Sequence, residues 1–178
     1  NIAIKNCTLT NIESGYSEVI SVDGNCTNIT ITGVTVTSTS VKSNIGICIC
    51  GNYNTCRVDS LDIPRHVTIS NCNVSNCKSD YRDGFAYGIY VDGGKDVKII
   101  NNNVSNCEGG IEVGAEKSSS LQYETEDIKV LNNTIKNCNI GAQIGGWDGK
   151  AIVYNVLFDK NTLLNCGHNG GKAIEFSL

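Results

Sequence analysis

Hydrophobic and polar residues alternate along the chain in a pattern that recurs six times. Each copy begins with a short strand of alternating apolar residues, continues through Asn and then Cys or Asn, and ends with a second short strand. Two copies, for example, read HVTISNCNVSNC and DVKIINNNVSNC. A repeat of this kind is the signature of a solenoid, in which each copy stacks on the next. The copies begin at Asn1, Asn28, His66, Asp96, Asp127 and Asn155.

A third apolar segment follows the two strands of each copy. These segments are VISV, GICI, GIYV, GIEV, GAQI and AIEF, at residues 19–22, 46–49, 88–91, 110–113, 141–144 and 173–176. Alternation predicts aliphatic columns that face the interior, such as Ile20, Ile47, Ile89, Ile111, Ala142 and Ile174. Three strands per turn predict an all-β fold, a three-sided, single-stranded parallel β-helix of about six coils. Parallel crossovers favour right-handed coiling.

Asparagine and cysteine recur at fixed positions between these strands. Asn tolerates the left-handed backbone angles of tight turns, and we expect two corner columns to form an asparagine ladder. The two columns are Asn6, Asn71, Asn101 and Asn132, and Asn76, Asn106, Asn137 and Asn165. We expect a third column, Cys77, Cys107, Cys138 and Cys166, to hold buried free thiols. A disulfide is more plausible between two of Cys48, Cys50 and Cys56.

The composition limits the classes of function. The 178 residues fit one domain, residues 1–178, and the net charge of −4 with no Lys/Arg cluster argues against a nucleic-acid partner. No run is long and apolar enough for a membrane span, and no signal segment opens the chain. Neither end shows the polar cap that a solenoid needs. We therefore expect an excerpt of a longer protein whose secretion signal lies elsewhere.

The repeat resembles the pectate-lyase-like superfamily of right-handed β-helices, which includes polysaccharide lyases, glycoside hydrolases, uronan epimerases and phage tailspikes. This resemblance covers essentially the whole chain. Residues 86–165, with AYGIYVDGGKDVKIINNNVSNCEGGIEVGAE, IGAQIGGWDG and NTLLNC, look like secreted bacterial β-helix proteins associated with polysaccharide degradation. The resemblance implies a secreted or cell-surface, carbohydrate-active protein whose partner is a polysaccharide or oligosaccharide.

Outward positions of the third strand interrupt the aliphatic pattern. One outward column reads Ser21, Cys48, Tyr90, Glu112, Gln143 and Glu175, and the next reads Asp23, Cys50, Asp92, Gly114 and Gly145. Long connections follow this strand at 50–65, 114–127 and 145–155, and loops on a rigid scaffold often carry function. Trp147 could stack on a sugar ring or cover the apolar flank of the coil. The candidate substrate-binding residues are Tyr90, Gln143, Trp147, Asp148 and Glu175.

Asp92 and Glu112 are the candidate catalytic pair of a glycoside hydrolase, with Glu116 as the substitute for Glu112. They would lie on adjacent turns, offset by two residues, with backbones roughly 8 Å apart. Carboxyl groups about 5 Å apart suit a retaining glycosidase, and about 6.5–9.5 Å an inverting one. The β-helical xylosidase-like glycosidases that this segment resembles carry a Glu where Gly114 stands here. The alternative is that these are solvated surface carboxylates.

Two other functions remain open from the residues. A calcium-dependent lyase would need carboxylates to hold calcium, here Asp83, Asp92 and Asp96, and a base such as Lys95 or Arg82. The hydrolase requires no cofactor or metal. A non-catalytic β-helix, such as an adhesin or a tailspike stalk, would present its loops to a glycan.

Overall fold

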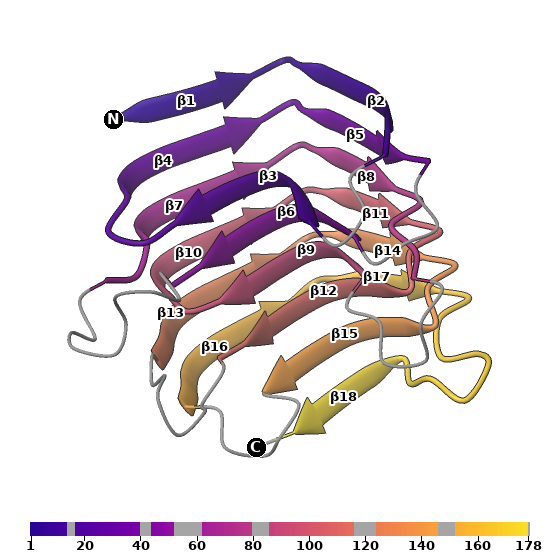
Figure 1. Ribbon diagram of the computed structural model, residues 1–178. Coiled ribbons are helices and arrows are strands. Elements are labelled where there is room, and N and C mark those ends of the chain that lie inside the picture. Colours follow the sequence, from indigo (N-terminus) through magenta and orange to yellow (C-terminus); the bar gives the residue numbers. More distant parts are fainter. Residues whose placement is uncertain are drawn as a thin grey trace.

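The computed structural model is built of strands, arranged as three parallel sheets that form the three sides of one coil (Figure 1). No helix long and apolar enough to cross a membrane occurs in the part of the chain that the structure describes. That part comprises residues 1–13, 17–39, 44–51, 62–79, 86–115, 124–145 and 152–177.

Each sheet contains six strands, one from each pass of the chain. Sheet A contains β1 (Ile2–Lys5), β4 (Thr27–Thr32), β7 (Arg65–Ser70), β10 (Gly94–Ile100), β13 (Glu124–Leu131) and β16 (Ile152–Asp159). Sheet B contains β2 (Thr8–Ile12), β5 (Thr35–Ser38), β8 (Asn73–Ser75), β11 (Asn103–Ser105), β14 (Thr134–Lys136) and β17 (Thr162–Leu164). Sheet C contains β3 (Ser17–Asp23), β6 (Asn44–Cys50), β9 (Tyr87–Asp92), β12 (Gly109–Gly114), β15 (Ile140–Gly145) and β18 (Ile174–Ser177).

The strand register confirms the predicted three-sided parallel β-helix. In sheet C, Ile47 pairs with Ile20 on one side and with Ile89 on the other, and Ile111 continues the same column. All pairings between neighbouring strands are parallel, as a solenoid of stacked copies requires.

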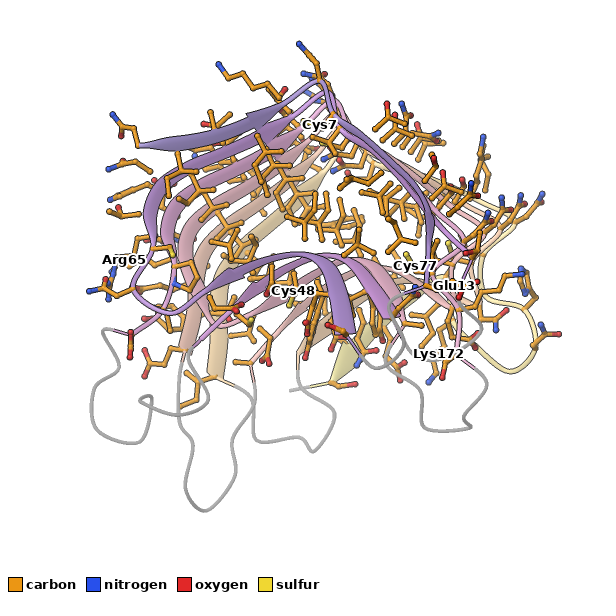
Figure 2. The ribbon with its side chains drawn as sticks, turned by 45° about the horizontal axis from the view of Figure 1, so that its top comes forward. Cys7, Glu13, Cys48, Arg65, Cys77 and Lys172 are labelled. Atoms are coloured by element: carbon orange, nitrogen blue, oxygen red, sulfur yellow. The ribbon has the colours of Figure 1, made fainter. Side chains whose placement is uncertain are left out.

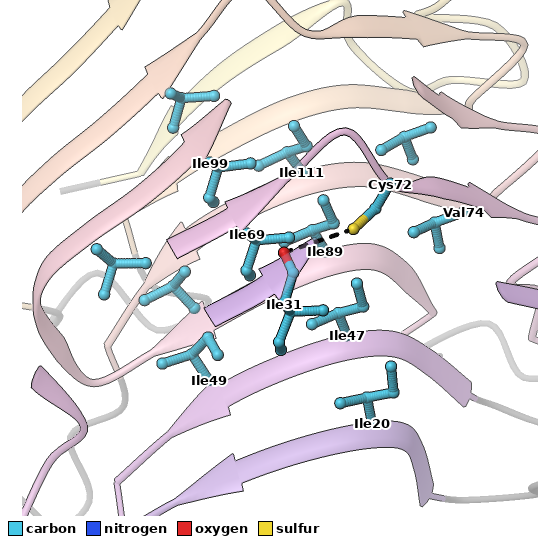
Figure 3. Close-up of a cluster of buried hydrophobic side chains, with 14 of the residues drawn as sticks. Ile20, Ile31, Ile47, Ile49, Ile69, Cys72, Val74, Ile89, Ile99 and Ile111 are labelled. Carbon is cyan, nitrogen blue, oxygen red and sulfur yellow. Dashed lines mark hydrogen bonds between the residues drawn. The ribbon is translucent and has the colours of Figure 1, made fainter. Parts of the chain in front are cut away.

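Aliphatic side chains from all three sheets fill the interior of the coil. Ile31 and Ile69 from sheet A meet Val74 from sheet B and Ile47 and Ile89 from sheet C (Figure 3). Burying one such side chain contributes roughly 1.5–3 kcal/mol, so this core is the main source of stability. Within it, the Cys72 thiol donates to the carbonyl oxygen of Ile31 at 3.7 Å.

The corners of the coil use left-handed backbone angles. Asn71 and Asn101 at one corner and Asn76 and Asn106 at another have φ between 54° and 63°. Asn supplies these angles at low cost, which explains its recurrence. Side-chain amides also contact one another along the stack, since Asn137 Nδ2 donates to Asn106 Oδ1 at 3.0 Å.

A second set of amides lies inside the coil. Asn102 Nδ2 donates to Asn133 Oδ1 at 3.0 Å, and Asn133 Nδ2 donates to Asn161 Oδ1 at 2.9 Å. Asn102 Nδ2 also donates to the carbonyl of Ile69 at 3.1 Å. These bonds satisfy polar groups that would otherwise be costly to bury.

The four-cysteine column holds free thiols, as predicted. Cys77, Cys107 and Cys138 are buried inside the coil, and Figure 2 shows Cys77 near the corner between sheets B and C. Hydrogen bonding to Cys107, together with burial, raises the pKa of the Cys138 thiol, so it stays protonated and unreactive.

The disulfide expected among Cys48, Cys50 and Cys56 is a wrong prediction. Cys48 and Cys50 are both free, so neither takes part in a disulfide, and Cys56 lies outside the described residues. Both belong to the outer cluster of sheet C, and Cys50 donates to Asp23 on the neighbouring strand.

Candidate functional site

The outer face of sheet C brings the predicted site column together. Tyr90 pairs with Cys48 on one side and with Glu112 on the other, and Glu112 pairs in turn with Gln143. Gln143 pairs with Glu175 in the last strand. The register therefore places side chains from separate copies of the repeat in one row, as expected.

Asp92 belongs to the adjacent row and pairs with Gly114. Since Glu112 lies two residues before Gly114, Asp92 and Glu112 are on neighbouring strands with the predicted offset of two residues. Both are on the outer face of the sheet, because their chain neighbours Val91 and Val113 face the core.

Both carboxylates are buried, so the alternative of solvated surface carboxylates does not hold. Asp92 is 0% exposed and Glu112 is 3% exposed, and Tyr90 and Gln143 are buried with them. An outward position on a strand is exposed to solvent only where no other part of the chain covers that face of the sheet. Acidic side chains are rarely buried unless they are paired or serve a function.

Gly114 leaves room for the carboxyl group of Glu112. A Cβ atom at Gly114 would lie 3.1 Å from Glu112 Oε1 and 3.7 Å from its Cδ. The Glu112 side chain therefore leans along its own strand into the space beside Gly114. That space lies beside Asp92, which pairs with Gly114 across the two strands.

Thr125 fixes the two strand ends that carry these residues. Its hydroxyl donates to the carbonyl oxygen of Gly114 at 2.6 Å and accepts the backbone N–H of Gly93 at 2.9 Å. Thr125 is fully buried, so these bonds are shielded from water. They hold the ends of β9 and β12 in register at the carboxylate pair.

Gly46 and Gly88 face the core, and the residue before each of them lies on the outer face of sheet C. A Cβ at Gly88 would lie 2.3 Å from Val104 Cγ1, and one at Gly46 would lie 2.4 Å from Val74 Cγ1. These glycines therefore face the core beside the first interior column, and Tyr87 and Ile45, which precede them, pack with the outward cluster.

Tyr87 is the functional candidate that the sequence prediction missed. Its hydroxyl donates to Gln143 Oε1 at 2.6 Å, and its ring stacks on Tyr90 with centroids 5.8 Å apart. Burial, together with the charge and hydrogen bonding of Glu112, raises the pKa of Tyr87, so the phenol remains a neutral donor. In the sequence, the glycine that opens the GIYV segment, Gly88, could have indicated that Tyr87 faces outward.

Thiols occupy the other side of the site. Cys50 Sγ donates to Asp23 Oδ1 at 2.7 Å, and the Ser21 hydroxyl also donates to this oxygen. Hydrogen bonding to Cys50 and burial raise the pKa of Cys48, to which the charge of Asp92 contributes. Cys48 is therefore a protonated neighbour of the carboxylate pair and not a thiolate nucleophile.

Of the three carboxylates proposed for a calcium site, the structure describes two, Asp92 and Asp96, and these two lie on different sheets. Asp92 is buried on β9 in sheet C, whereas Asp96 lies on β10 in sheet A and contacts His66 Nδ1 at 2.8 Å and Lys98 Nζ at 3.5 Å. Across the described ranges, no group of three or more His, Cys, Asp or Glu side chains is arranged to hold a metal ion. Asp92 and Asp96 therefore lie on different sheets with different partners, and Asp83 lies outside the described residues.

The remaining predicted residues have different outcomes. Glu175 is partly exposed and accepts a hydrogen bond from Lys172 Nζ at 2.6 Å. Glu116, Trp147 and Asp148 lie outside the described residues, as does Arg82.

Comparison with known proteins identifies the type of fold. The family model described as a right-handed beta helix region matches residues 1–177. No curated protein and no solved structure matched the chain. The family match is consistent with the three parallel sheets and agrees with the right-handed coiling expected from the sequence.

Proposed function

The chain belongs to the right-handed β-helix family, and from the outer face of sheet C we propose that it is an extracellular carbohydrate-active protein that cleaves glycosidic bonds. Asp92 and Glu112 act as its carboxylate pair. Since a fold alone does not assign a reaction, the proposal rests on this site. The resemblance of residues 86–165 to secreted polysaccharide-active β-helices supports the substrate class and the location.

One observation carries the proposal. The Glu112 carboxylate occupies the space beside Gly114, directly opposite Asp92 on the neighbouring strand. Positions that face each other across parallel strands lie about 4.8 Å apart. The two carboxyl groups can therefore converge toward the separation of about 5–5.5 Å that retaining glycosidases use, whereas inverting enzymes hold them about 6.5–9.5 Å apart.

The arrangement suits a double-displacement reaction. The Glu112 carboxylate forms a bond to the anomeric carbon while the glycosidic C–O bond breaks and Asp92 gives its proton to the leaving oxygen. In the second step, Asp92 takes a proton from water, and the water oxygen displaces Glu112 from the anomeric carbon. Both carboxyl groups then return to their starting states.

Access to the pair is the main structural requirement of this reaction. Asp92 and Glu112 are shielded from solvent, so a glycan can reach them only if the atoms that cover them are displaced. A reactive site that is shielded from water has stronger electrostatic interactions within it.

The test is the release of reducing ends from a panel of neutral and acidic polysaccharides. Wild-type protein should cleave at least one of them, and Asp92→Asn should lose turnover while retaining binding of the same glycan. Glu126→Gln is the matched control, because Glu126 is a carboxylate on sheet A that lies outside the site. Equal turnover by wild type and Asp92→Asn would refute the assignment.

A non-catalytic glycan-binding β-helix is the second candidate. The burial of both carboxylates favours it, because carboxylates that are shielded from solvent do not reach a glycan bound at the surface. In that case glycan binding occurs without turnover by the wild type. A lyase would instead release unsaturated, ultraviolet-absorbing products and lose activity with a calcium chelator.

A further inference from the structure

Tyr87 lies where it can organise the carboxylate pair, although it is not in the row that contains Glu112. It is the first residue of β9 and is 6% exposed. Its hydroxyl reaches across β12 to Gln143 on β15, the second strand along the sheet. Glu112, on β12 between them, pairs with Gln143, so the phenol spans the strand that carries the proposed nucleophile.

Gly109 makes this reach possible. It pairs with Tyr87 across the strands, and a Cβ atom at Gly109 would lie 2.1 Å from Cε1 of the ring and 2.8 Å from its Cζ. The ring therefore lies over the Gly109 backbone, in space that any other residue would fill. A side chain at position 109 would push the phenol away from β12, so the placement of the Tyr87 ring depends on Gly109.

We propose that Tyr87 is a positioning residue, whose hydroxyl fixes the side-chain amide of Gln143 in the row that contains the Glu112 carboxylate. The inference rests on the proposed function, since it assigns a role in the same reaction. Because the single hydroxyl proton goes to Gln143 Oε1, the amide N–H₂ group of Gln143 is the donor left for Glu112, and a donor beside a carboxylate favours its charged form. That form is the one required of the nucleophile.

The charges around Glu112 show why such a donor is useful. Tyr87 and Tyr90 from β9 face it together with Asp92, the pair partner. Glu108 and Glu175 also act on the Tyr87 phenol through their charges. Negative charges close to a carboxylate disfavour its ionisation, and the neutral Tyr87 phenol adds none beside Glu112.

The test compares Tyr87→Phe with Tyr154→Phe in the full chain. Tyr154 is the matched control, because its hydroxyl also donates to carboxylates, Glu124 and Glu126, but on the exposed face of sheet A. Tyr87→Phe should move the acidic limb of the profile of kcat/KM against pH upward by about one unit and lower kcat by roughly tenfold. Tyr154→Phe should leave both unchanged.

Gly109→Ala tests the same arrangement without removing the hydroxyl. Because its Cβ would displace the Tyr87 ring, it should shift the acidic limb in the same direction. Gly94→Ala is its control, since a Cβ there would come no closer than 3.1 Å to a neighbouring atom and lies away from the phenol. This second route keeps the proposal testable if Tyr87→Phe fails to fold.

An unchanged acidic limb in a folded Tyr87→Phe or Gly109→Ala variant would overturn the inference, whatever happens to thermal stability. If the wild type cleaves no glycan, the proposed function fails, and the inference is then tested by carbon NMR titration of the Glu112 carboxyl. A higher titration midpoint in Tyr87→Phe than in wild type supports the positioning role, and an equal midpoint rejects it.

Discussion

Two tyrosine–carboxylate clusters occur on different faces of the coil, and they are built from the same residue types in different surroundings. On sheet A, the Tyr154 hydroxyl donates to Glu124 and Glu126, and Lys95 forms an ion pair with Glu126. The Tyr154 side chain is 44% exposed. On sheet C, the Tyr87 hydroxyl donates to Gln143, which pairs with Glu112, and all three residues are buried.

The difference shows what burial adds to a repeated pattern. Stacked copies align side chains on every face of a solenoid, so alignment alone produces charged rows. On sheet A the row is solvated and contains its own cation, which is the usual form of a surface ion-pair network. On sheet C the carboxylates have been taken out of water, and this makes their protonation sensitive to each neighbouring donor and charge.

The largest effect on folding should come from disturbing sheet C from the inside. A Cβ at Gly110 would lie 2.3 Å from the carbonyl oxygen of Gly141 and 2.4 Å from Ile135 Cγ2. Gly110→Ala should therefore lower the free energy of unfolding by about 1–3 kcal/mol, since backbone must move to relieve the overlap. Denaturant unfolding measures the change.

Gly94→Ala, in sheet A, is the comparison for that variant. The nearest atom to its Cβ, Val97 Cγ2, lies 3.1 Å away and can shift by a rotation of its side chain. It should cost clearly less than Gly110→Ala. Equal costs would mean that the glycine column of sheet C has no special packing role.

The smallest effect should come from the exposed cluster. The Lys95 ammonium and the Tyr154 hydroxyl lower the pKa of Glu126 from its ordinary value of 4.5. A group whose pKa is lower in the folded state stabilises the fold above its unfolded pKa and loses that contribution as pH falls. Glu126→Gln should therefore slightly reduce the loss of stability between neutral pH and pH values below 4.5.

Thermal unfolding of wild type and Glu126→Gln across this pH range measures the difference. Because the ion pair of Lys95 and Glu126 is partly exposed to solvent, the change should be near the limit of detection. A large change would show that the two clusters are energetically alike, against the contrast drawn between them.

The sequence was sufficient for the fold and for the register of the site. Each aliphatic column requires one residue in every copy, so Ile47, Ile89 and Ile111 could be aligned by counting alone. The offset of Asp92 and Glu112 followed from the same count.

Burial and side-chain direction could not be predicted in this way. The prediction assumed strict alternation, whereas the inward glycines shift the residue before them, so Tyr87 turns outward. The lean of Glu112 over Gly114 depends on the absence of a side chain on its own strand and on rotamer choice. Both effects arise from contacts between strands and not from the pattern within one strand.

The most direct test of the central claim is the turnover of Asp92→Asn, Glu112→Gln and the double variant on a glycan that the wild type cleaves. If the two carboxylates act as one catalytic unit, each single substitution should lower kcat/KM by about 10²- to 10⁴-fold. The double variant should then have a kcat/KM only slightly below that of the less active single variant, because the effects of residues that act together are not additive. Single variants that retain wild-type turnover would contradict the account.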